Sequence, residues 1–362
     1  MKRIILIILL LLVTFLTAPA IKLGVLKDVL KPESICVWGD ELYVVEGATI
    51  HCFSLTDLKP IKTFGKAGEG PGEMRILPFW PIQITLTQDC VFAENMDKFI
   101  FFSKQGNLIN EQKKMKRLFK VLPVKENYAA RTFPFEGNDK KQYEALKLLN
   151  KKMEDEKELF RQSVPVLDRE GTVKMFPDSM NFCVYGDNIF VERSTEGFRI
   201  DVFDSQGNKL YEIKKPYEKT LVTEEYKKTA EASLKESLLH KKVGVFVPFH
   251  IMESGWDAFK KWALLDYPEY LPPIRDFLVK NDKIYVQTYV QQKGQEQYVI
   301  LDLKGEILKT VNLPRIKNAS VFVYNTLGIG LRFYDFEKDR FIYIEENEDL
   351  EEWEVYVVPV EI

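Results

Sequence analysis

Histidine and cysteine are scarce in this chain of 362 residues, which contains only three of the first and four of the second. His51, His240 and His250 form no metal-ligand spacing with one another or with a cysteine, so we expect no histidine-rich zinc site. The sequence also lacks the Gly-x-Ser-x-Gly motif that presents a serine nucleophile. No catalytic constellation is evident, and the sequence leaves enzymatic activity and cofactors open.

A surplus of basic residues is missing as well. The chain has 51 Lys and Arg against 54 Asp and Glu, a net charge of −3, and the loss of Lys2 and Arg3 with a leader would make it −5. Proteins that bind nucleic acid need positive charge to neutralise phosphates. We therefore expect no nucleic-acid partner.

A long apolar run occurs only at the N-terminus. Lys2 and Arg3 are followed by an apolar stretch over residues 4–12 and by small residues over 17–20, the order of a secretory signal peptide. The stretch is short for a membrane span, which needs roughly 20 apolar residues. We expect residues 1–20 to be removed, and the mature chain 21–362 to be periplasmic or extracellular without a membrane span.

The remaining sequence is built on a repeated phrase. Gly-Asp or Asn-Asp stands between β-branched and aromatic residues, a pattern that predicts a strand, a tight turn and a strand. Three clear copies occupy residues 37–44, 184–191 and 279–286, and three weaker copies occupy 86–92, 124–128 and 336–342. The chain therefore contains six such units.

A second phrase, with glycine in its turn, follows several copies of the first, at residues 102–108, 203–210 and 301–308. Two hairpins per unit make a four-stranded antiparallel sheet, and sheets repeated around an axis form the blades of a propeller. Residues 142–160 fit this repeat although their Leu, Lys and Glu content favours a helix, and we assign them two strands of the third blade. The sequence predicts an all-β, six-bladed β-propeller over 21–362.

The two ends of the chain predict how the ring closes. Residues 21–26 form a short strand without a hairpin partner nearby, and the last unit ends soon after Val358. We expect this N-terminal strand to be the outer strand of the last blade.

An insertion separates the fourth and fifth units, because Asp187 and Asp282 lie 95 residues apart. Thr223 has the character of a helix N-cap, and a second helical stretch carries Trp256 and Trp262. We predict a helical insertion over about 216–270, between blades 4 and 5. Its aromatic residues either pack in a local core, the interpretation we favour, or form a lid over a binding surface.

The repeat also gives simple explanations for two sets of residues. Cys36 and Cys52 lie about two strand spacings apart, ~9 to 10 Å, which is too far for a disulfide, and Cys36 and Cys183 lie on opposite sides of the ring. We expect buried free thiols. The recurring aspartates suggest either calcium ligands or local turn hydrogen bonds, and their turn positions favour the second; they are Asp40, Asp89, Asp187, Asp282 and Asp339.

A family resemblance rests on three segments: the glycine-rich residues 64–73, which we assign to the crossing between blades 1 and 2, and residues 267–276 and 346–354. These resemble segments of an uncharacterised bacterial family of six-bladed propellers, similar to NHL-repeat propellers, whose members usually carry signal peptides. The resemblance implies the fold and an extracytoplasmic location. It implies no activity and no catalytic residues.

These observations favour a binding or scaffold propeller outside the cytoplasm, whose ligand is an unknown protein, peptide or glycan. The alternative is a metal-dependent hydrolase or lyase with its site at the central channel. The candidate binding residues are Arg275 and Asp276, which we place at the mouth of the channel, and Trp256 and Trp262, which would form the lid.

Overall fold

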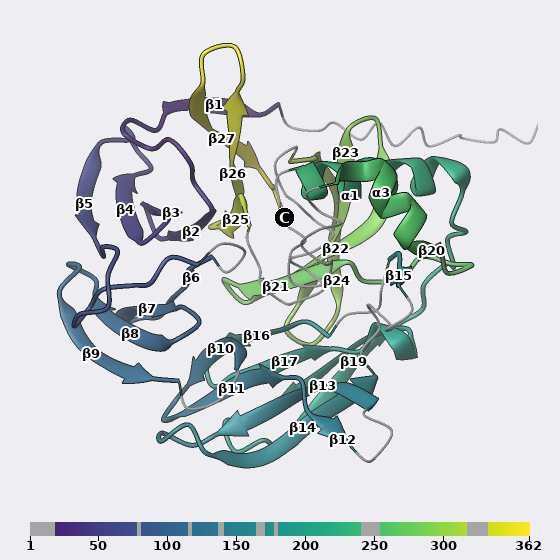
Figure 1. Ribbon diagram of the computed structural model, residues 1–362, viewed down its shortest axis with the longest axis horizontal. Coiled ribbons are helices and arrows are strands. Elements are labelled where there is room, and N and C mark those ends of the chain that lie inside the picture. The colour runs from purple at the N-terminus through teal and green to yellow at the C-terminus, as the bar shows by residue number, and fades with distance from the viewer. Residues whose placement is uncertain are drawn as a thin grey trace, which may run out of the picture.

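The pairing of strands follows the repeat in the sequence. A computed structural model describes residues 19–77, 81–114, 118–136, 141–163, 171–176, 180–239, 254–316 and 332–362. Six antiparallel sheets stand around a central axis, so the chain is a six-bladed β-propeller, as predicted (Figure 1). The predicted signal peptide falls almost entirely outside the described residues.

Four blades consist of four consecutive strands, each paired with its neighbours in chain order. They are blade 1, with β2 (Ser34–Trp38), β3 (Glu41–Glu46), β4 (Thr49–Ser54) and β5 (Pro60–Phe64); blade 2, with β6 (Gln83–Leu86), β7 (Cys90–Glu94), β8 (Lys98–Ser103) and β9 (Leu108–Lys113); blade 4, with β16 (Phe182–Tyr185), β17 (Asn188–Glu192), β18 (Phe198–Phe203) and β19 (Lys209–Lys215); and blade 5, with β21 (Asp276–Lys280), β22 (Lys283–Gln292), β23 (Gln295–Asp302) and β24 (Ile307–Pro314). The first phrase forms the hairpin between the first two strands. The second phrase forms the hairpin between the last two.

Blade 3 has the same plan with one interruption. Its strands are β10 (Phe119–Val124), β11 (Asn127–Thr132), β12 (Phe135–Glu136), β13 (Lys141–Leu149) and β14 (Asp155–Ser163). Both β11 and β12 pair with β13, so they act as one broken strand, and β14 pairs with the other edge of β13. The two strands predicted for residues 142–160 are confirmed, because pairing on both edges of β13 outweighs the local preference for helix.

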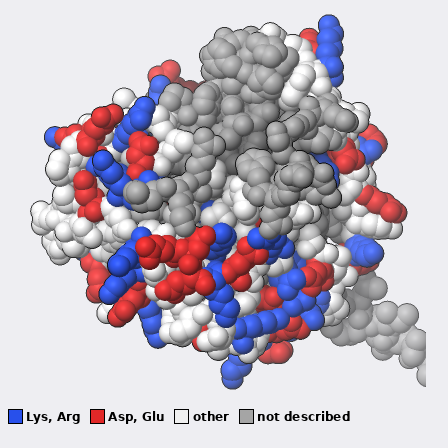
Figure 2. All heavy atoms as spheres, turned by 60° about the horizontal axis from the view of Figure 1, so that its bottom comes forward, with Lys and Arg blue, Asp and Glu red and all other residues white. Residues whose placement is uncertain are grey.

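Charges of both signs cover the rim of the molecule. Figure 2 shows Lys and Arg side chains interspersed with Asp and Glu over the outer strands of blades 3 and 4. Many of them form exposed pairs, such as Arg161 with Glu158 at 2.7 Å and Lys209 with Glu212 at 2.7 Å. Such pairs contribute little to stability. No helix in the described part of the chain is long and apolar enough to cross a membrane.

The N-terminal strand closes the ring, as predicted. Blade 6 contains β25 (Tyr334–Glu337), β26 (Arg340–Asn347) and β27 (Glu352–Pro359), and its outer strand is β1 (Ile21–Val25) from the other end of the chain. Lys22 on β1 donates to the carboxylate of Glu354 on β27 at 2.6 Å. The backbone N–H of Leu26 extends the contact by donating to the carbonyl of Trp353 at 2.8 Å.

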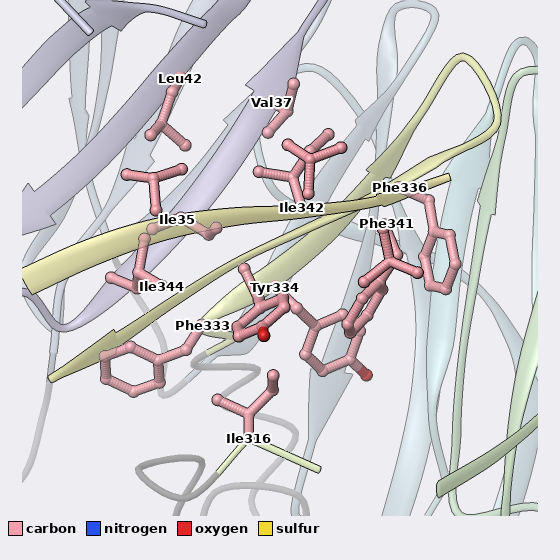
Figure 3. Packing of buried hydrophobic residues seen from close by; sticks show 14 of the residues in the cluster. Ile35, Val37, Leu42, Ile316, Phe333, Tyr334, Phe336, Phe341, Ile342 and Ile344 are labelled. Atoms are coloured by element: carbon pink, nitrogen blue, oxygen red, sulfur yellow. The ribbon is translucent and has the colours of Figure 1, made fainter. Parts of the chain in front are cut away.

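The hydrophobic core is a ring of clusters between neighbouring blades. One cluster joins blades 5, 6 and 1, where Ile35, Phe336 and Phe341 are at most 2% exposed. Figure 3 shows Ile35 of blade 1 beside Ile342 and Ile344 of blade 6. Phe336 and Phe341 lie on the other side of blade 6, where they pack against Tyr285 and Tyr298 of blade 5. Separate clusters lie between blades 1 and 2, 2 and 3, 3 and 4, and 4 and 5. Because each blade buries its faces against its neighbours, the ring must be complete for every blade to be covered.

In blades 2, 4 and 5, the glycine of the second phrase lies against the preceding blade. Gly305, in the turn between β23 and β24, has φ +92°, and a Cβ there would lie 2.6 Å from Ile213 of blade 4. Gly106 and Gly207 are in equivalent positions, where a Cβ would lie 2.8 and 2.6 Å from side chains of the preceding blade. Glycine is therefore required for both the turn and the approach of the next blade.

The predicted helical insertion is present between blades 4 and 5. It contains α1 (Glu224–Leu239) and α3 (Gly255–Trp262), which contact each other (Figure 1). Thr223 caps α1 by accepting a hydrogen bond from the backbone of Tyr226 at 3.4 Å. After α3, the short strand β20 (Leu264–Asp266) pairs in parallel with β15 (Thr172–Lys174), which precedes blade 4. The only other described helix is a 3-10 turn at Ser194–Glu196.

Candidate functional site

The first strands of all six blades surround a cavity of about 500 Å³ on the propeller axis. The cavity has the size of small-molecule sites, which range from roughly 300 to 1,000 Å³. Every first strand begins at the same end of this channel, which we call the entry end, and reaches its hairpin turn at the other, which we call the turn end. Residues of β2, β6, β10, β16, β21 and β25 line the wall.

The residues that line the cavity come from both sides of the first strands. Successive residues of a strand point to opposite sides, and on β2 Ile35 packs against the cluster of blades 5, 6 and 1 while Cys36 packs against that of blades 1 and 2, yet both border the cavity. On β10, Val121 is buried between blades, whereas Lys120 on the opposite side is partly accessible. The wall therefore combines apolar residues with a few charged groups.

A cluster of four residues marks the entry end. Lys120 of β10 donates to the side-chain oxygen of Asn181 at 2.7 Å, and Asn181 in turn contacts the carboxylate of Asp276. Arg332, just before β25, binds both oxygens of Asp276, at 2.8 and 3.0 Å. Blades 3 and 5 and the two segments that lead into β16 and β25 thus meet at one hydrogen-bonded group. Of the two cations, Arg332 pairs with Asp276 directly, and Lys120 is linked to it through Asn181.

The surroundings of Lys120 lower its pKa strongly. Burial and the nearby Arg332 lower the pKa of Lys120 to about 8, with a smaller contribution from Arg131. Asp276 and the Cys183 thiol act in the opposite direction but do not compensate. Lys120 is still mostly protonated at neutral pH, so a positive charge faces the cavity there.

The turn end of the channel has its own charged group. Lys280 of β21 lies 2.8 Å from Asp335 and 3.2 Å from Glu337, both on β25. Asp335 also accepts a hydrogen bond from the backbone N–H of Val37 at 2.7 Å. This group joins blades 5, 6 and 1, and its lysine is fully compensated by carboxylates.

Two cysteines line the channel. All four cysteines are free thiols, as predicted, but Cys36, Cys90 and Cys183 are only half-buried, so the expectation of burial is wrong for these three. Cys36 of β2 and Cys183 of β16 border the cavity and also pack against the clusters between blades. Burial within the molecule raises the pKa of each to about 12, so both remain neutral thiols.

The two candidate residues before β21 have different surroundings. Arg275 is buried within blade 5 and forms an ion pair with Glu296 of β23 at 2.6 Å, and it does not line the cavity. Asp276 belongs to the entry-end cluster through Arg332, which does line the cavity. The sequence analysis placed both residues at the mouth of the channel, but in the structure only Asp276 is connected to the cavity and Arg275 is not.

The two candidate tryptophans lie in the helical insertion. Trp256 and Trp262 pack on either side of Phe259, with ring centroids 5.4 and 5.9 Å from it. Phe259 is fully buried in a cluster with residues of α1 and β15, so these aromatic side chains form a local core. Neither tryptophan lines the channel cavity.

The turn aspartates do more than the sequence suggested. Four of the five repeated aspartates have a partner in the preceding blade, so local turn hydrogen bonds are not the whole explanation. Asp40 accepts from Arg340 at 3.2 Å and Asp339 from Lys283 at 2.5 Å. Asp187 pairs with Lys125 at 2.9 Å, and Asp282 accepts from Tyr185 at 3.0 Å. The repeated aspartate therefore links successive blades at the turn end.

Lys120 and Arg332 were missed by sequence reasoning. Lys120 lies outside the matching part of its weak repeat copy, and Arg332 stands before the last copy. The available signal was the presence of a charged residue beside the start of a predicted first strand. Alternation along such a strand can place a lysine on the channel side, but the sequence does not show which residue faces it across the ring.

Metal ligands are not grouped in the described part of the chain. No three His, Cys, Asp or Glu side chains there lie close enough together to hold one ion. His51, the one histidine within the described ranges, lies 3.4 Å from Glu46.

Comparisons with known proteins add only distant likenesses. No protein-family model and no curated protein sequence matches this chain. Among solved structures, the Pan2 WD40 domain of Neurospora crassa is 10% identical with a TM-score of 0.36, and covers 91% of this chain and 90% of its own. Hydrazine synthase of Kuenenia stuttgartiensis is 11% identical with a TM-score of 0.38, over 89% and 79% of the two chains. BamB of Moraxella catarrhalis is 10% identical with a TM-score of 0.30, over 90% and 68%.

The class of protein is therefore defined by the strand pairing of the chain itself: a six-bladed propeller whose first strands line a central cavity. The closer resemblance to NHL-repeat propellers stays a prediction.

Proposed function

We propose that this protein is an exported binding propeller that holds a small molecule in its central channel. The observation that carries the proposal is the cavity of about 500 Å³, to which every blade contributes its first strand. Few, well-placed polar groups on a partly apolar wall are typical of ligand sites. Lys120 and Arg332 supply such groups at the entry end, and Thr85 and Cys183 face the same space.

Export is supported by the match between the expected cleavage site and the fold. The first strand begins at Ile21, directly after the predicted cleavage position, so removal of residues 1–20 would leave all six blades complete. The intact mass of the protein recovered from the cell envelope or the medium tests this. A mature chain starting at Ile21 is expected, and a cytoplasmic protein that retains residues 1–20 would contradict export.

Blocking the channel tests the binding function. Small polar metabolites are screened by thermal shift, and those that stabilise the protein are titrated by calorimetry against wild type and Cys183→Phe. Because the phenyl ring would occupy part of the cavity, we expect affinity for a channel ligand to fall by about tenfold or more, equivalent to about 1.4 kcal/mol.

Leu210→Phe is the matched control. Leu210 lies in the same blade on the outer strand β19 and is 50% exposed, so the same ring is added far from the channel. This variant is expected to bind like wild type. Ligands that bind Cys183→Phe and wild type equally well would place the site elsewhere and contradict the proposal.

A further inference from the structure

In the part of the chain that the structure describes, the charges at the entry end are not balanced. Arg332 pairs with Asp276 and Lys120 is linked to that carboxylate only through Asn181, whereas Lys280 at the turn end has two carboxylates of its own. A third cation near the cavity, Lys114, lies 2.5 Å from Glu94, which lines the wall. Among the described residues, Lys120 is thus the channel lysine whose hydrogen-bond acceptor is a neutral amide instead of a carboxylate.

The geometry also leaves donors free at this point. An ammonium group has three N–H donors, and one from Lys120 goes to Asn181. Arg332 uses its Nε and one terminal nitrogen on Asp276 and on the carbonyl of Phe277. Within the described residues, its other terminal nitrogen has no hydrogen-bond partner. A charged, half-buried lysine beside such a guanidinium is a suitable place for an anion.

We propose that the entry end of the channel binds the carboxylate of a small monoanionic molecule, with Lys120 as its principal partner. This inference rests on the proposed binding function and names the class of its ligand. One carboxylate would match the two cations to two anions, whereas a phosphate or sulfate dianion would leave negative charge in excess in a confined space. The rest of the cavity accommodates the body of the molecule.

Butyrate is the probe that tests this inference, with butyramide as its neutral counterpart of nearly the same shape. Binding is measured by calorimetry on the mature protein at constant ionic strength. We expect butyrate to bind wild type at pH 7, and butyramide to bind about tenfold more weakly or worse, because a charge-assisted hydrogen bond is lost. Sulfate, tested in the same way, is expected to bind more weakly than butyrate.

Lys120→Met removes the charge and keeps an unbranched side chain. We expect butyrate affinity to fall by about tenfold or more, an effect of at least about 1.4 kcal/mol. Lys125→Met is the matched control, because Lys125 stands just after the same strand but is exposed and paired with Asp187 at the turn end. Lys120→Arg keeps the charge and is expected to retain most of the binding.

The pH dependence of wild type supplies a test that needs no variant. Butyrate keeps its charge between pH 7 and 9.5, while Lys120, with its pKa lowered to about 8, loses its proton over this range. Affinity should therefore fall by more than about tenfold from pH 7 to 9.5. Equal binding of butyrate to wild type and Lys120→Met, a flat pH profile, no binding to wild type, or a preference for sulfate would each overturn the inference.

Cys183→Phe distinguishes failure of the carboxylate inference from failure of the proposed binding function. Loss of butyrate binding in that variant places the probe in the channel. If another ligand is blocked by Cys183→Phe but binds Lys120→Met as it binds wild type, the binding function stands and the carboxylate inference fails. If no ligand is blocked by Cys183→Phe, both fail.

Discussion

Asp276 shows how a single residue can connect neighbouring blades. Burial alone raises the pKa of its carboxyl group, but the attraction and hydrogen bonds of Arg332 outweigh burial, and the pKa is below its ordinary value. The carboxylate also contacts Asn181, and the hydroxyl of Tyr334 donates to it at 3.3 Å. Its charge is therefore part of the folded structure at neutral pH.

Removal of that charge should destabilise the propeller. We expect Asp276→Asn to lower the free energy of unfolding by about 2 kcal/mol, because the partly buried Arg332 would lose its counter-charge. Urea unfolding at pH 7 measures the change. Asp187→Asn is the control, since Asp187 pairs with Lys125 in an exposed turn and should change stability by less than about 0.5 kcal/mol. Equal losses in the two variants would contradict this role.

The sequence could indicate Asp276 but not its partners. Asp276 stands at the start of a recognisable repeat unit, so its place beside the channel followed from the repeat. Arg332 and Lys120 come from other blades, and their approach to Asp276 depends on the closed ring. Contacts between residues so far apart in one chain cannot be derived from local patterns.

At the level of strands and turns, the two repeated phrases both help to join one blade to the next. The aspartate of the first phrase binds the preceding blade at the turn end, as Asp339 does with Lys283. The glycine of the second phrase lets the outer hairpin approach the preceding blade, as Gly305 does with Ile213. Both residues were recognised as turn formers, and they also join one blade to the next.

Two glycines of blade 5 allow the stability effect of turn geometry to be measured separately from that of packing between blades. Gly305 and Gly294 both have positive φ, +92° and +76°, but a Cβ at Gly294 would meet no atom within 4 Å. We expect Gly294→Ala to cost about 1 kcal/mol of unfolding free energy through backbone strain. Gly305→Ala should cost about 1 to 3 kcal/mol more, because the added methyl group must displace Ile213.

Thermal and urea unfolding of both variants measure this difference. Similar losses would mean that only the turn requires glycine, and that packing between blades 4 and 5 tolerates a side chain at Gly305. The result bears on the repeat as a whole, since Gly106 and Gly207 have equally short approaches to the preceding blade.

Local patterns predicted the elements well because hairpins are local structures. Each first phrase contains both strands and their turn, and the six resulting hairpins are all present. The expectation of buried cysteines failed for a different reason. Cys36 and Cys183 are at equivalent positions of first strands and border the cavity that the closed ring leaves around its axis. Alternation along one strand does not predict that cavity.

For the whole molecule, the decisive contact is the pairing of the two ends of the chain. Blade 6 has three strands from the C-terminal region, and β1 completes it from the N-terminal region. The adjacent core includes residues of blades 5, 6 and 1, so an open ring would expose apolar surface on both sides of the gap. Lys22 and Glu354 form the ion pair that joins β1 to this blade.

This closure predicts how stability depends on acidity. The hydrogen bond from Lys22, together with those from Tyr356 and Asn347, lowers the pKa of Glu354 from 4.5 to about 2. A carboxyl group with a depressed pKa in the folded state stabilises the protein fully above its unfolded pKa, and the contribution is lost as the pH falls through the folded value. Glu354 should therefore contribute fully above about pH 4.5 and lose its contribution between pH 4.5 and 2.

Melting temperatures of wild type and Glu354→Gln, measured from pH 7 to pH 2, test this. The variant should melt below wild type at pH 7, and the difference should shrink as the pH falls toward 2, because protonated Glu354 resembles glutamine. Glu348→Gln, in the exposed turn of the same hairpin, is the control and should follow wild type throughout. A constant difference between wild type and Glu354→Gln would mean that the side chain stabilises blade 6 without its charge, and that the backbone pairing of β1 with β27 closes the ring by itself.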